Sequence, residues 1–556
     1  MEYAPYQLHA RLVSSLEKGF VTEPVEAYPA LDKISVLKGE RLNFQLFLRT
    51  EHVECKHTHL YIVEAEGIDA TAREVKQVYA DLPCYDRDNS RAEGLLLESQ
   101  SGLYPDVLEP LDAGNRLRPK EDTLTAVWFE ATMMEAGTYP VTVTIKEKDE
   151  TLVSLPLTVT VVDAALPEQS LIFTQWFHCD CLASYYNVPV FSEEHWRIME
   201  NYMAYAVRHG VNCILTPVLT PPLDTEVGTE RPTVQLVGVI KNGGEYRFDF
   251  SLLKRYLDMA KACGIRYFEI SHLFTQWGAA YAPKVVAMVD GIERRIFGWH
   301  TPGTEGEYPR FLSKLLPALV AFLRAEGVLA NCRFHVSDEP REEHLEGYCK
   351  AKAAIEPYLK GCTIIDALSN IEFFRHGAVQ IPVPATNHIE PFLTEDIQER
   401  WTYYCCSQWE KVSNRFIAYP AFRNRIIGVQ LYKFKIEGFL HWGYNFYYAQ
   451  GSRRLINPYL TQSGGGLWES GDTFSVYPGP LGQPLASSRL SVFYDALQDM
   501  EALKLCESLV GREKVVALID ELAGAPVTFT EYPKSADYLL ILRERINEMI
   551  AEAVSR

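Results

Sequence analysis

Hydrophobic and polar residues alternate in short runs through the first 165 residues of the chain. The clearest runs are residues 41–48, 124–129, 139–145 and 152–162. Alternation with a period of two is typical of strands that bury one face, and turn residues such as those at 135–138 separate the runs. The pattern predicts an N-terminal β-sandwich domain over residues 1–165, made of two packed antiparallel sheets.

From residue 170 to about 510, apolar strand-like runs alternate with amphipathic helices. The predicted strands are residues 172–177, 212–216, 267–271, 334–337, 363–367, 379–383, 402–405 and 438–442. The predicted helices include residues 194–208, 251–262, 310–325, 342–359 and 418–434, and the fifth and sixth helices are expected to be short or irregular. Eight strands with helices between them predict a (β/α)8 TIM-like barrel at 170–510. The remaining residues, 511–556, predict a C-terminal helical segment packed on the barrel, with apolar residues near helical spacing over 538–553.

Two connections in the barrel region are longer than simple loops, at about 276–308 and 443–484. Both follow a predicted strand, so we expect them over the carboxyl ends of the strands, where barrel enzymes have their active sites. They carry Trp277, Trp299, His300, Trp468, Asp472 and Tyr477. Aromatic rings stack on the apolar faces of sugars, so Trp277 is a candidate carbohydrate contact. The alternative is that these aromatic residues fasten the loops to the barrel.

Charge and composition exclude several classes of partner. The chain has 54 basic and 73 acidic residues, a formal charge of −19, which disfavours nucleic acid and anionic membrane surfaces. No run of about 18 apolar residues predicts a membrane span. The twelve cysteines are scattered without CxxC or HExxH spacing, so neither a metal site nor a cofactor is predicted. With no signal-like start, the sequence predicts a cytoplasmic protein with reduced thiols.

The candidate chemistry centres on Asp338 and Glu339, which directly follow a predicted barrel strand and precede Pro340. Carboxylates are costly to bury unless they are paired or functional. One structural alternative is that Asp338 caps the next helix, and another is that Glu339 pairs with a lysine. Most glycoside hydrolases use two carboxylates about 5 to 9 Å apart on opposite sides of the bond, which neighbours rarely achieve. Adjacent acids suit a substrate-assisted reaction, where one protonates the leaving oxygen and the other orients the substrate's own 2-acetamido group.

Further candidates for substrate contact stand at the ends of the first, seventh and eighth predicted strands. They are His178, Asp180, Tyr403, Tyr404, Gln408, Trp442, Tyr444 and Asn445. Their hydroxyl, carboxyl and indole groups are suited to bind sugar hydroxyls or an acetamide. Alternatively, His178 and Asp180 support other side chains without touching the ligand.

Five motifs occur in order: VSDEP at 336–340, YYCCS at 403–407, NRFI at 414–417, EGFLHWGYN at 437–445 and GDTFSVYPG at 471–479. Together they resemble glycoside hydrolase family 123 and the related domain-of-unknown-function family 4091. The helix-like segment 488–502 is similar to the closing segment of that family. A departure is the run Ser407-Gln408-Trp409, where related sequences tend to have a turn rich in glycine and proline.

The resemblance implies a β-N-acetylgalactosaminidase with a retaining, substrate-assisted mechanism. It implies that Glu339 is the general acid/base, that Asp338 orients the acetamide, and that Trp442, Asn445 and Asp472 contact the sugar. We therefore expect a metal-independent, exo-acting glycosidase that removes terminal β-linked N-acetylgalactosamine from a glycolipid or oligosaccharide. Two alternatives stay open: a barrel glycosidase for a sugar without acetamide participation, and a non-catalytic carbohydrate-binding protein. The linkage, the aglycone and the oligomeric state, a homo-oligomer included, are not determined by the sequence.

Overall fold

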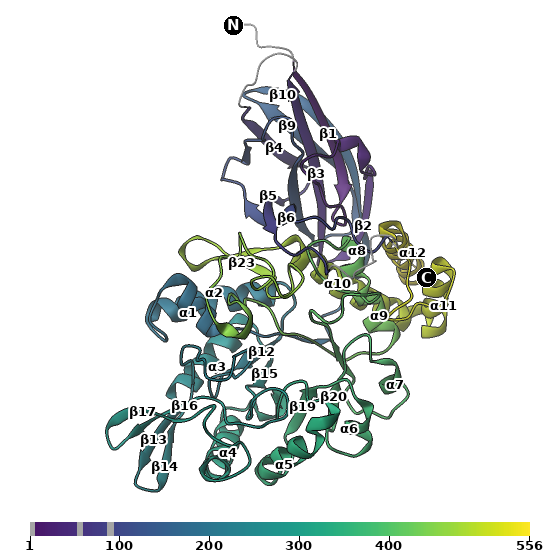
Figure 1. The fold of residues 1–556 in the computed structure, drawn as a ribbon. Coiled ribbons are helices and arrows are strands. Elements are labelled where there is room, and N and C mark those ends of the chain that lie inside the picture. Colours follow the sequence, from purple (N-terminus) through teal and green to yellow (C-terminus); the bar gives the residue numbers. More distant parts are fainter. Residues whose placement is uncertain (1–5, 53–58, 86–93, 556) are drawn as a thin grey trace.

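The computed structural model describes residues 6–52, 59–85 and 94–555. A strand-rich N-terminal region stands on a larger barrel of strands and helices, and the C-terminal helices lie beside their junction (Figure 1). Within the described residues, no helix is both long and apolar enough to cross a membrane.

The N-terminal region consists of two five-stranded sheets, with strand orders β1-β3-β8-β5-β6 and β2-β10-β9-β4-β7. The strands are β1 (Tyr6–Ser14), β2 (Lys33–Lys38), β3 (Glu40–His52), β4 (Tyr61–Glu66), β5 (Ala70–Ala80), β6 (Gly102–Pro110), β7 (Arg116–Leu117), β8 (Thr125–Met133), β9 (Gly137–Glu147) and β10 (Glu150–Ala165). Side chains from both sheets form one core, in which the Phe44 and Phe129 rings stack at 5.1 Å. The predicted β-sandwich is confirmed, with one difference: β10 pairs with β2 in parallel.

Eight parallel strands form the barrel, in the order β20-β19-β18-β15-β12-β11-β22-β21. They are β11 (Ile172–Gln175), β12 (Cys213–Thr216), β15 (Tyr267–Ile270), β18 (Cys332–Phe334), β19 (Thr363–Ala367), β20 (Ile381–Val383), β21 (Trp401–Tyr403) and β22 (Gly438–His441). Hydrogen bonds from Tyr403 N to Pro384 O and from Thr386 N to Tyr403 O join β21 to the residues after β20. Each predicted strand overlaps an observed one, although β18 ends at Phe334, where the predicted strand 334–337 begins. The predicted barrel is confirmed, with this one strand displaced.

Helices alternate with the barrel strands and continue to the C-terminus. They are α1 (Cys179–Tyr186), α2 (Glu193–Arg208), α3 (Ser251–Cys263), α4 (Glu307–Ala325), α5 (Leu345–Ile355), α6 (Ile371–Arg375), α7 (Glu390–Leu393), α8 (Ala421–Arg425), α9 (Ile427–Lys433), α10 (Ser488–Val510), α11 (Arg512–Ala523) and α12 (Ala536–Val554). Short 3-10 turns are η1 (Val25–Ala27), η2 (Leu329–Asn331), η3 (Glu342–His344), η4 (Glu356–Tyr358), η5 (Gln450–Ser452) and η6 (Pro480–Gly482). The fifth and sixth barrel helices, α6 and α7, are short, as predicted. The predicted helix 418–434 begins only after Pro420, because proline lacks the N–H needed inside a helix.

A small four-stranded sheet was not predicted. Its order is β14-β13-β16-β17, with bounds β13 (Gly238–Asn242), β14 (Glu245–Asp249), β16 (Val285–Val289) and β17 (Ile292–Phe297). It projects from the side of the barrel (Figure 1), so the expectation that 276–308 lies wholly over the strand ends is wrong. The dipeptide Asp290-Gly291, with positive φ at both residues, was a usable hairpin signal. The pairing of β13 with β16 joins two separate connections, which only the tertiary fold creates.

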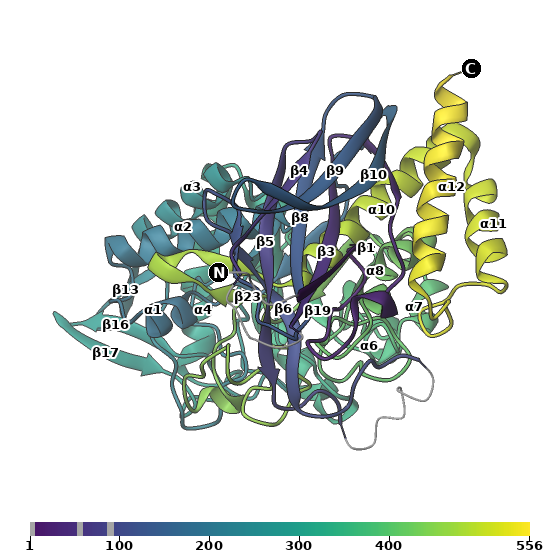
Figure 2. The same cartoon turned by 90° about the horizontal axis from the view of Figure 1, so that it is seen from above.

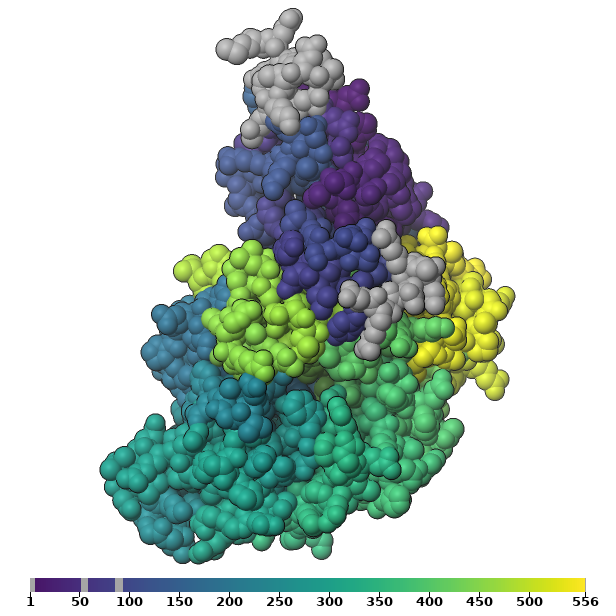
Figure 3. Space-filling view, viewed as in Figure 1, coloured from purple at the N-terminus to yellow at the C-terminus, as the bar shows by residue number. Residues whose placement is uncertain are grey.

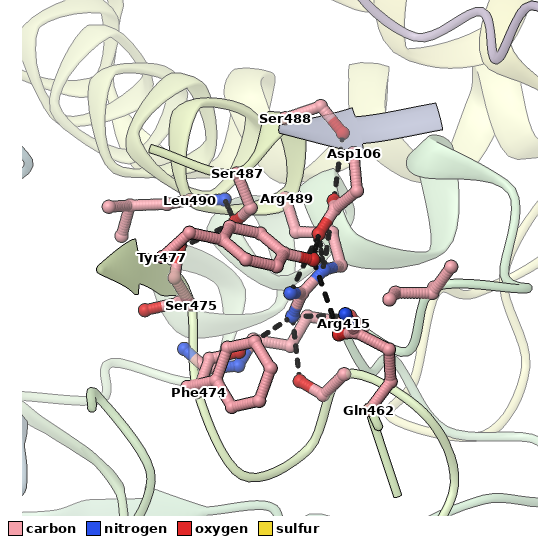
Figure 4. A network of polar contacts seen from close by, with 12 residues as sticks. Asp106, Arg415, Gln462, Phe474, Ser475, Tyr477, Ser487, Ser488, Arg489 and Leu490 are labelled. Atoms are coloured by element: carbon pink, nitrogen blue, oxygen red, sulfur yellow. Dashed lines mark hydrogen bonds and ion pairs between the residues drawn. The ribbon is translucent and has the colours of Figure 1, made fainter. Parts of the chain in front are cut away.

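The sandwich is fastened to the barrel through Asp106 on β6. Its buried carboxylate accepts hydrogen bonds from Arg489 Nη2 at 2.9 Å and from Tyr477 Oη at 2.6 Å (Figure 4). Arg489 lies in the first turn of α10, and Tyr477 lies on β23 (Val476–Pro478), which pairs with β24 (Pro484–Ala486). The segment around 440–480 accordingly lies against the sandwich and the barrel at once (Figure 3).

The C-terminal helices complete the junction. Helix α12 contacts α10 and also strands β2 and β10 of the sandwich, and Figure 2 shows α11 and α12 beside α10. Arg543 of α12 is ion-paired with Glu40 and, at 2.9 Å, with Asp499 of α10. Arg543 and Glu40 line a cavity of about 270 Å³ together with Arg425 and Asp495.

Candidate active site

The cavity that combines titratable groups with aromatic walls lies at the carboxyl ends of the barrel strands and has a volume of about 140 Å³. Its lining residues are Trp176, His178, Leu223, Asp224, Gln276, Trp277, Asp338, Glu339, Ala367, Tyr403, Cys405, Cys406, Leu440, Trp442, Phe446 and Trp468. Because parallel strands bring their carboxyl ends to one rim, residues that are distant in the sequence meet here.

Both adjacent acids reach this cavity. Strand β18 ends at Phe334, and the chain continues through His335 to Asp338 before it turns at Glu339, which has a φ of 44°. Neighbouring residues of a regular strand point to opposite faces, and this left-handed residue breaks the alternation. Backbone hydrogen bonds from Trp277 N to Asp338 O and from Glu339 N to Ala367 O, both 3.0 Å, fix the turn.

Each carboxylate has its own hydrogen-bond donor. Gln276 Nε2 donates to Asp338 Oδ2 at 2.7 Å, and Tyr403 Oη donates to Glu339 Oε1 at 2.7 Å. Gln276 is itself held, because its Oε1 accepts from Asp224 N at 2.6 Å. Among the residues that the structure describes, Asp338 caps no helix and Glu339 has no lysine partner. The two structural alternatives for the acids therefore do not apply.

Burial and the neighbouring Glu339 carboxylate raise the pKa of Asp338 to about 8, despite the Gln276 hydrogen bond. Two carboxyl groups this close share their protons, so the pair as a whole retains one proton near neutral pH. The Gln276 amide donates to one carboxyl oxygen of Asp338 and leaves the other free to carry the proton. The hydrogen bond is therefore compatible with both protonation states of Asp338. Asp338 therefore retains a proton near neutral pH.

Beneath the acids lies a buried charge cluster that sequence reasoning missed. His335 Nε2 lies 2.7 Å from Glu269 Oε1, and its Nδ1 lies 3.3 Å from Asp366 Oδ1. Burial lowers the pKa of His335, but the hydrogen bonds to Asp366 and Glu269 outweigh it and raise the pKa to about 10. With carboxylates at both ring nitrogens, His335 is an imidazolium. A histidine in an apolar strand was the only signal for this cluster in the sequence.

His272 stacks on His335 with ring centroids 4.2 Å apart and an interplanar angle of 21°. His272, His335 and Asp366 place potential metal-ligand atoms within 4.8 Å of one another. Nearly parallel rings do not direct their nitrogen lone pairs toward a common point, and both nitrogens of His335 already contact carboxylates. The cluster therefore fits an ion-paired support for β18 better than a metal site.

Four of the predicted substrate contacts line the cavity: His178, Trp277, Tyr403 and Trp442. Trp277 is 52% exposed at the rim. Trp442 packs against Trp468 and Phe446 at centroid distances of 5.1 and 5.0 Å, which gives the cavity an aromatic wall.

Both ring nitrogens of His178 are hydrogen-bonded to other residues of the cavity wall. Its Nδ1 accepts a hydrogen bond from Arg231 Nη2 at 3.1 Å, so its Nε2 carries the proton and donates to Trp442 O at 2.9 Å. Burial and the Arg231 charge lower the pKa of His178 to about 3. The ring is neutral and has no free nitrogen for a ligand.

The other predicted contacts lie behind the wall, outside the cavity lining. Asp180 accepts two hydrogen bonds from Arg231, both 2.7 Å. Tyr444 Oη donates to Tyr202 O at 3.0 Å, and Asn445 is bonded to the backbone of His178 at 2.9 and 3.1 Å. Tyr404 is fully buried. Asp180, Tyr444 and Asn445 thus support the wall through protein partners rather than facing a ligand.

Asp472 and Gln408 also lie outside the cavity lining and hold residues that line it. Trp442 Nε1 donates to Asp472 Oδ2 at 2.9 Å, and burial raises the pKa of Asp472 to about 7. Gln408 Oε1 accepts from Cys405 N at 2.9 Å and so shapes the turn after β21. Asp472 therefore orients the indole that faces the cavity.

Several lining residues were not predicted as contacts: Trp176, Asp224, Gln276, Cys405, Cys406 and Phe446. Asp224 lies in an irregular connection after β12, where no strand or helix pattern marks it. Its Oδ2 accepts from Gly451 N at 3.0 Å, and burial raises its pKa to about 6. Its backbone N–H holds Gln276, so it supports Asp338 from a distant loop.

Comparison with known proteins shows the family of the chain. A family profile described as glycoside hydrolase 123, catalytic domain, matches residues 176–506, which is more than half of the chain. The chain belongs to glycoside hydrolase family 123. The matched range includes both acids and the complete set of cavity-lining residues.

Among solved structures, the chain is similar to a family 123 glycoside hydrolase from Clostridium perfringens, described in a study of glycolipid glycan hydrolysis. The TM-score is 0.72 at 14% identity, over 99% of this chain and 98% of that chain. At this identity the likeness establishes the fold, sandwich and barrel together. A family 39 glycoside hydrolase from Bacteroides cellulosilyticus is more distant, with a TM-score of 0.32 at 9% identity over 87% and 82% of the two chains. A search of curated proteins gives no significant match.

Proposed function

We propose that this glycoside hydrolase removes terminal β-linked N-acetylgalactosamine by a retaining, substrate-assisted mechanism. The observation that carries the proposal is that Asp338 and Glu339, adjacent in sequence, both face one cavity and have separate hydrogen-bond donors. Acids from one strand end approach the sugar from the same side, whereas two acids acting across the bond need to face each other. A nucleophile supplied by the substrate removes that requirement.

In the first step, the acetamide carbonyl oxygen attacks the anomeric carbon as the glycosidic bond breaks. Glu339 gives its proton to the departing oxygen, and Asp338 accepts a hydrogen bond from the acetamide N–H of the oxazolinium-type intermediate. In the second step, Glu339 takes a proton from a water molecule. The water oxygen attacks the anomeric carbon, and the oxazolinium ring opens to give back the acetamide. Two inversions at that carbon give overall retention, and Glu339 regains its proton.

The shared proton of the acid pair fits these roles. Burial and the neighbouring Glu339 hold the proton on Asp338. An acetamide N–H directed at Asp338 favours its anion, since a carboxylate accepts this bond more strongly than an acid does. Substrate binding then leaves the proton on Glu339, where it is needed for the leaving oxygen.

The substrate class follows from the walls. Trp442, Trp468 and Phe446 offer apolar faces to a sugar ring, and the exposed Trp277 stands at the rim, where the next unit of a glycan would lie. A glycan on a lipid or a free oligosaccharide would fit such a rim. The glycolipid glycans associated with the Clostridium perfringens relative support the first of these.

The test compares aryl β-N-acetylgalactosaminide with the matching aryl β-galactoside. We expect cleavage of the first alone, inhibition by a thiazoline mimic of the cyclised intermediate, and losses of about 100-fold or more in Glu339→Gln and Asp338→Asn. Equal cleavage of the plain galactoside would exclude acetamide participation and favour a glycosidase for another sugar. Binding of glycans without cleavage of any glycoside would favour a carbohydrate-binding protein.

A further inference from the structure

Two cysteines that the proposed reaction does not use lie side by side in the wall of the active site. Cys405 and Cys406 follow β21 directly, and both line the cavity that contains Asp338 and Glu339. Cys405 is 7% exposed, and Cys406 is part-exposed. The two residues are neighbours in the chain and both contribute to the lining of one cavity, so a single ligand in the cavity can reach both side chains.

The turn that carries these thiols is held by its backbone. Cys405 N donates to Gln408 Oε1 at 2.9 Å, and Cys405 O accepts from Asn414 Nδ2 at 3.0 Å. Because the main chain of Cys405 is held at both its N–H and its carbonyl, little conformational entropy is lost when one ligand takes both sulfurs.

The surroundings of the pair keep it protonated. The hydrogen bond to Cys406, together with burial, raises the pKa of Cys405, and the carboxylates of Glu339 and Asp472 act in the same direction. A protonated thiol is a poor nucleophile toward reagents that attack one sulfur at a time. A ligand that binds both sulfurs gains the advantage of a chelate, which raises affinity by about 10²- to 10⁴-fold.

The number of available donors limits the ligand. In the described part of the chain, one group of three histidine, cysteine or acidic side chains lies close enough to share a metal ion. It consists of His272, His335 and Asp366 and contains no cysteine. A cation such as Zn²⁺ needs three or four protein ligands. Trivalent arsenic that already carries an organic group needs two sulfurs and no third protein ligand.

We propose that Cys405 and Cys406 form a dithiol site that chelates trivalent organoarsenicals and thereby blocks the active-site cavity. With an arsenoxide, R–As=O, two S–H bonds break and two As–S bonds form. The oxygen leaves as water with both protons, and arsenic remains trivalent throughout. Chelation itself depends only on the two thiols, whereas the loss of activity rests on the proposed function of the cavity.

The other close pair of cysteines provides a contrast. Cys179 and Cys181 lie in the first turn of α1 with 2% and 0% exposure, and neither lines the cavity. Residues two apart on a helix point to different faces, so their sulfurs do not converge. Cys349 on α5 is exposed and serves as the accessible single-thiol control.

The binding test treats the folded full-length protein with phenylarsine oxide and counts the groups bound by intact mass. We expect one group per chain, with affinity at least about 100-fold weaker in Cys405→Ser and in Cys406→Ser but unchanged in Cys349→Ser. In the wild type, alkylation after denaturation should leave the peptide containing residues 405–406 unmodified, which maps the site without any variant. Uptake elsewhere, uptake by the two serine variants equal to that of the wild type, or no uptake by the folded wild type would overturn the proposal.

The activity test uses the same reagent on aryl β-N-acetylgalactosaminide cleavage. We expect inhibition that a dithiol reverses and that prior binding of a thiazoline slows, with little effect of iodoacetamide at equal concentration. Chelation at 405–406 without inhibition would overturn the claim that the ligand blocks the cavity. If the enzyme cleaves no such glycoside, mass measurement and peptide mapping still decide the dithiol site, so the two proposals fail separately.

Discussion

The hydroxyl of Tyr403 donates a 2.7 Å hydrogen bond to Oε1 of Glu339 across the mouth of the barrel. Tyr403 ends β21 and Glu339 follows β18, and strands β19 and β20 lie between them around the barrel. The bond therefore exists because the barrel closes between the residues after β20 and β21. It fixes the direction in which the proposed acid/base presents its second oxygen.

Replacing Tyr403 by phenylalanine should lower kcat/KM by about 10- to 100-fold, since a hydrogen bond to a charged group contributes about 1.5–3 kcal/mol. The assay is cleavage of an aryl β-N-acetylgalactosaminide. The matched control is Tyr404→Phe, because the buried Tyr404 hydroxyl has no hydrogen-bond partner among the described residues. Equal losses in both variants would show that the Tyr403 hydroxyl has no special role.

Asp338→Asn should stabilise the protein at neutral pH while it removes activity. The folded-state pKa of Asp338 is about 8, above its ordinary value of about 3.9. The folded protein therefore binds the extra proton between these values, and its stability falls as pH rises through this window. Urea unfolding at several pH values should show a smaller decline between pH 4 and 8 in the variant. An unchanged decline would contradict the raised pKa.

Arg231→Met should destabilise the protein by about 3–5 kcal/mol, because it leaves the buried Asp180 carboxylate without its partner. The double variant Asp180→Leu/Arg231→Met should regain much of this loss, since no charge is then left uncompensated. Denaturant unfolding of both single variants and the double variant measures the coupling. If the single changes were additive, the pair would not act as a unit, and direct ligand binding by Asp180 would regain support.

His335→Gln should also cost about 3–5 kcal/mol, because it removes the positive charge between Glu269 and Asp366. The folded-state pKa of His335 is about 10, above its ordinary value of about 6.5. Its stabilising effect is complete below pH 6.5 and is lost as pH rises toward 10. Measured in an Asp338→Asn background, stability should decline from pH 7 to 10 with His335 and not with glutamine. A decline of equal size in both would mean that His335 is not charged.

The order of strands and helices could be read from the sequence because it depends on local periodicity. A sandwich strand buries one face, so hydrophobic and polar residues alternate along it. A barrel strand is buried on both faces, so it is a continuous apolar run. Both patterns are visible in the sequence. The position of Asp338 and Glu339 at a strand end was visible for the same reason. The small sheet of β13, β14, β16 and β17 was not, because two distant hairpins complete each other there.

The roles of individual side chains, unlike the order of strands and helices, could not be read from the sequence. Asp180 was expected at the end of the first strand but lies in the first turn of α1, and Tyr444 and Asn445 follow β22 as expected. Each has a protein partner: Arg231, Tyr202 and the backbone of His178, respectively. Gln276 and Asp224 support Asp338 from connections whose sequence has no recognisable pattern. A strand end indicates only that a residue is near the rim, and partners from other strands decide which way it faces.

The sequence by itself determined the sandwich, the barrel, and the pair of adjacent acids that suits a substrate carrying its own nucleophile. The tertiary structure decided that both acids face one cavity, through the left-handed turn at Glu339. It also placed a buried imidazolium beneath them and two thiols beside them. The physical reason is that periodicity follows from burial along one segment, whereas hydrogen bonds and ion pairs across the barrel depend on strand order, register and closure.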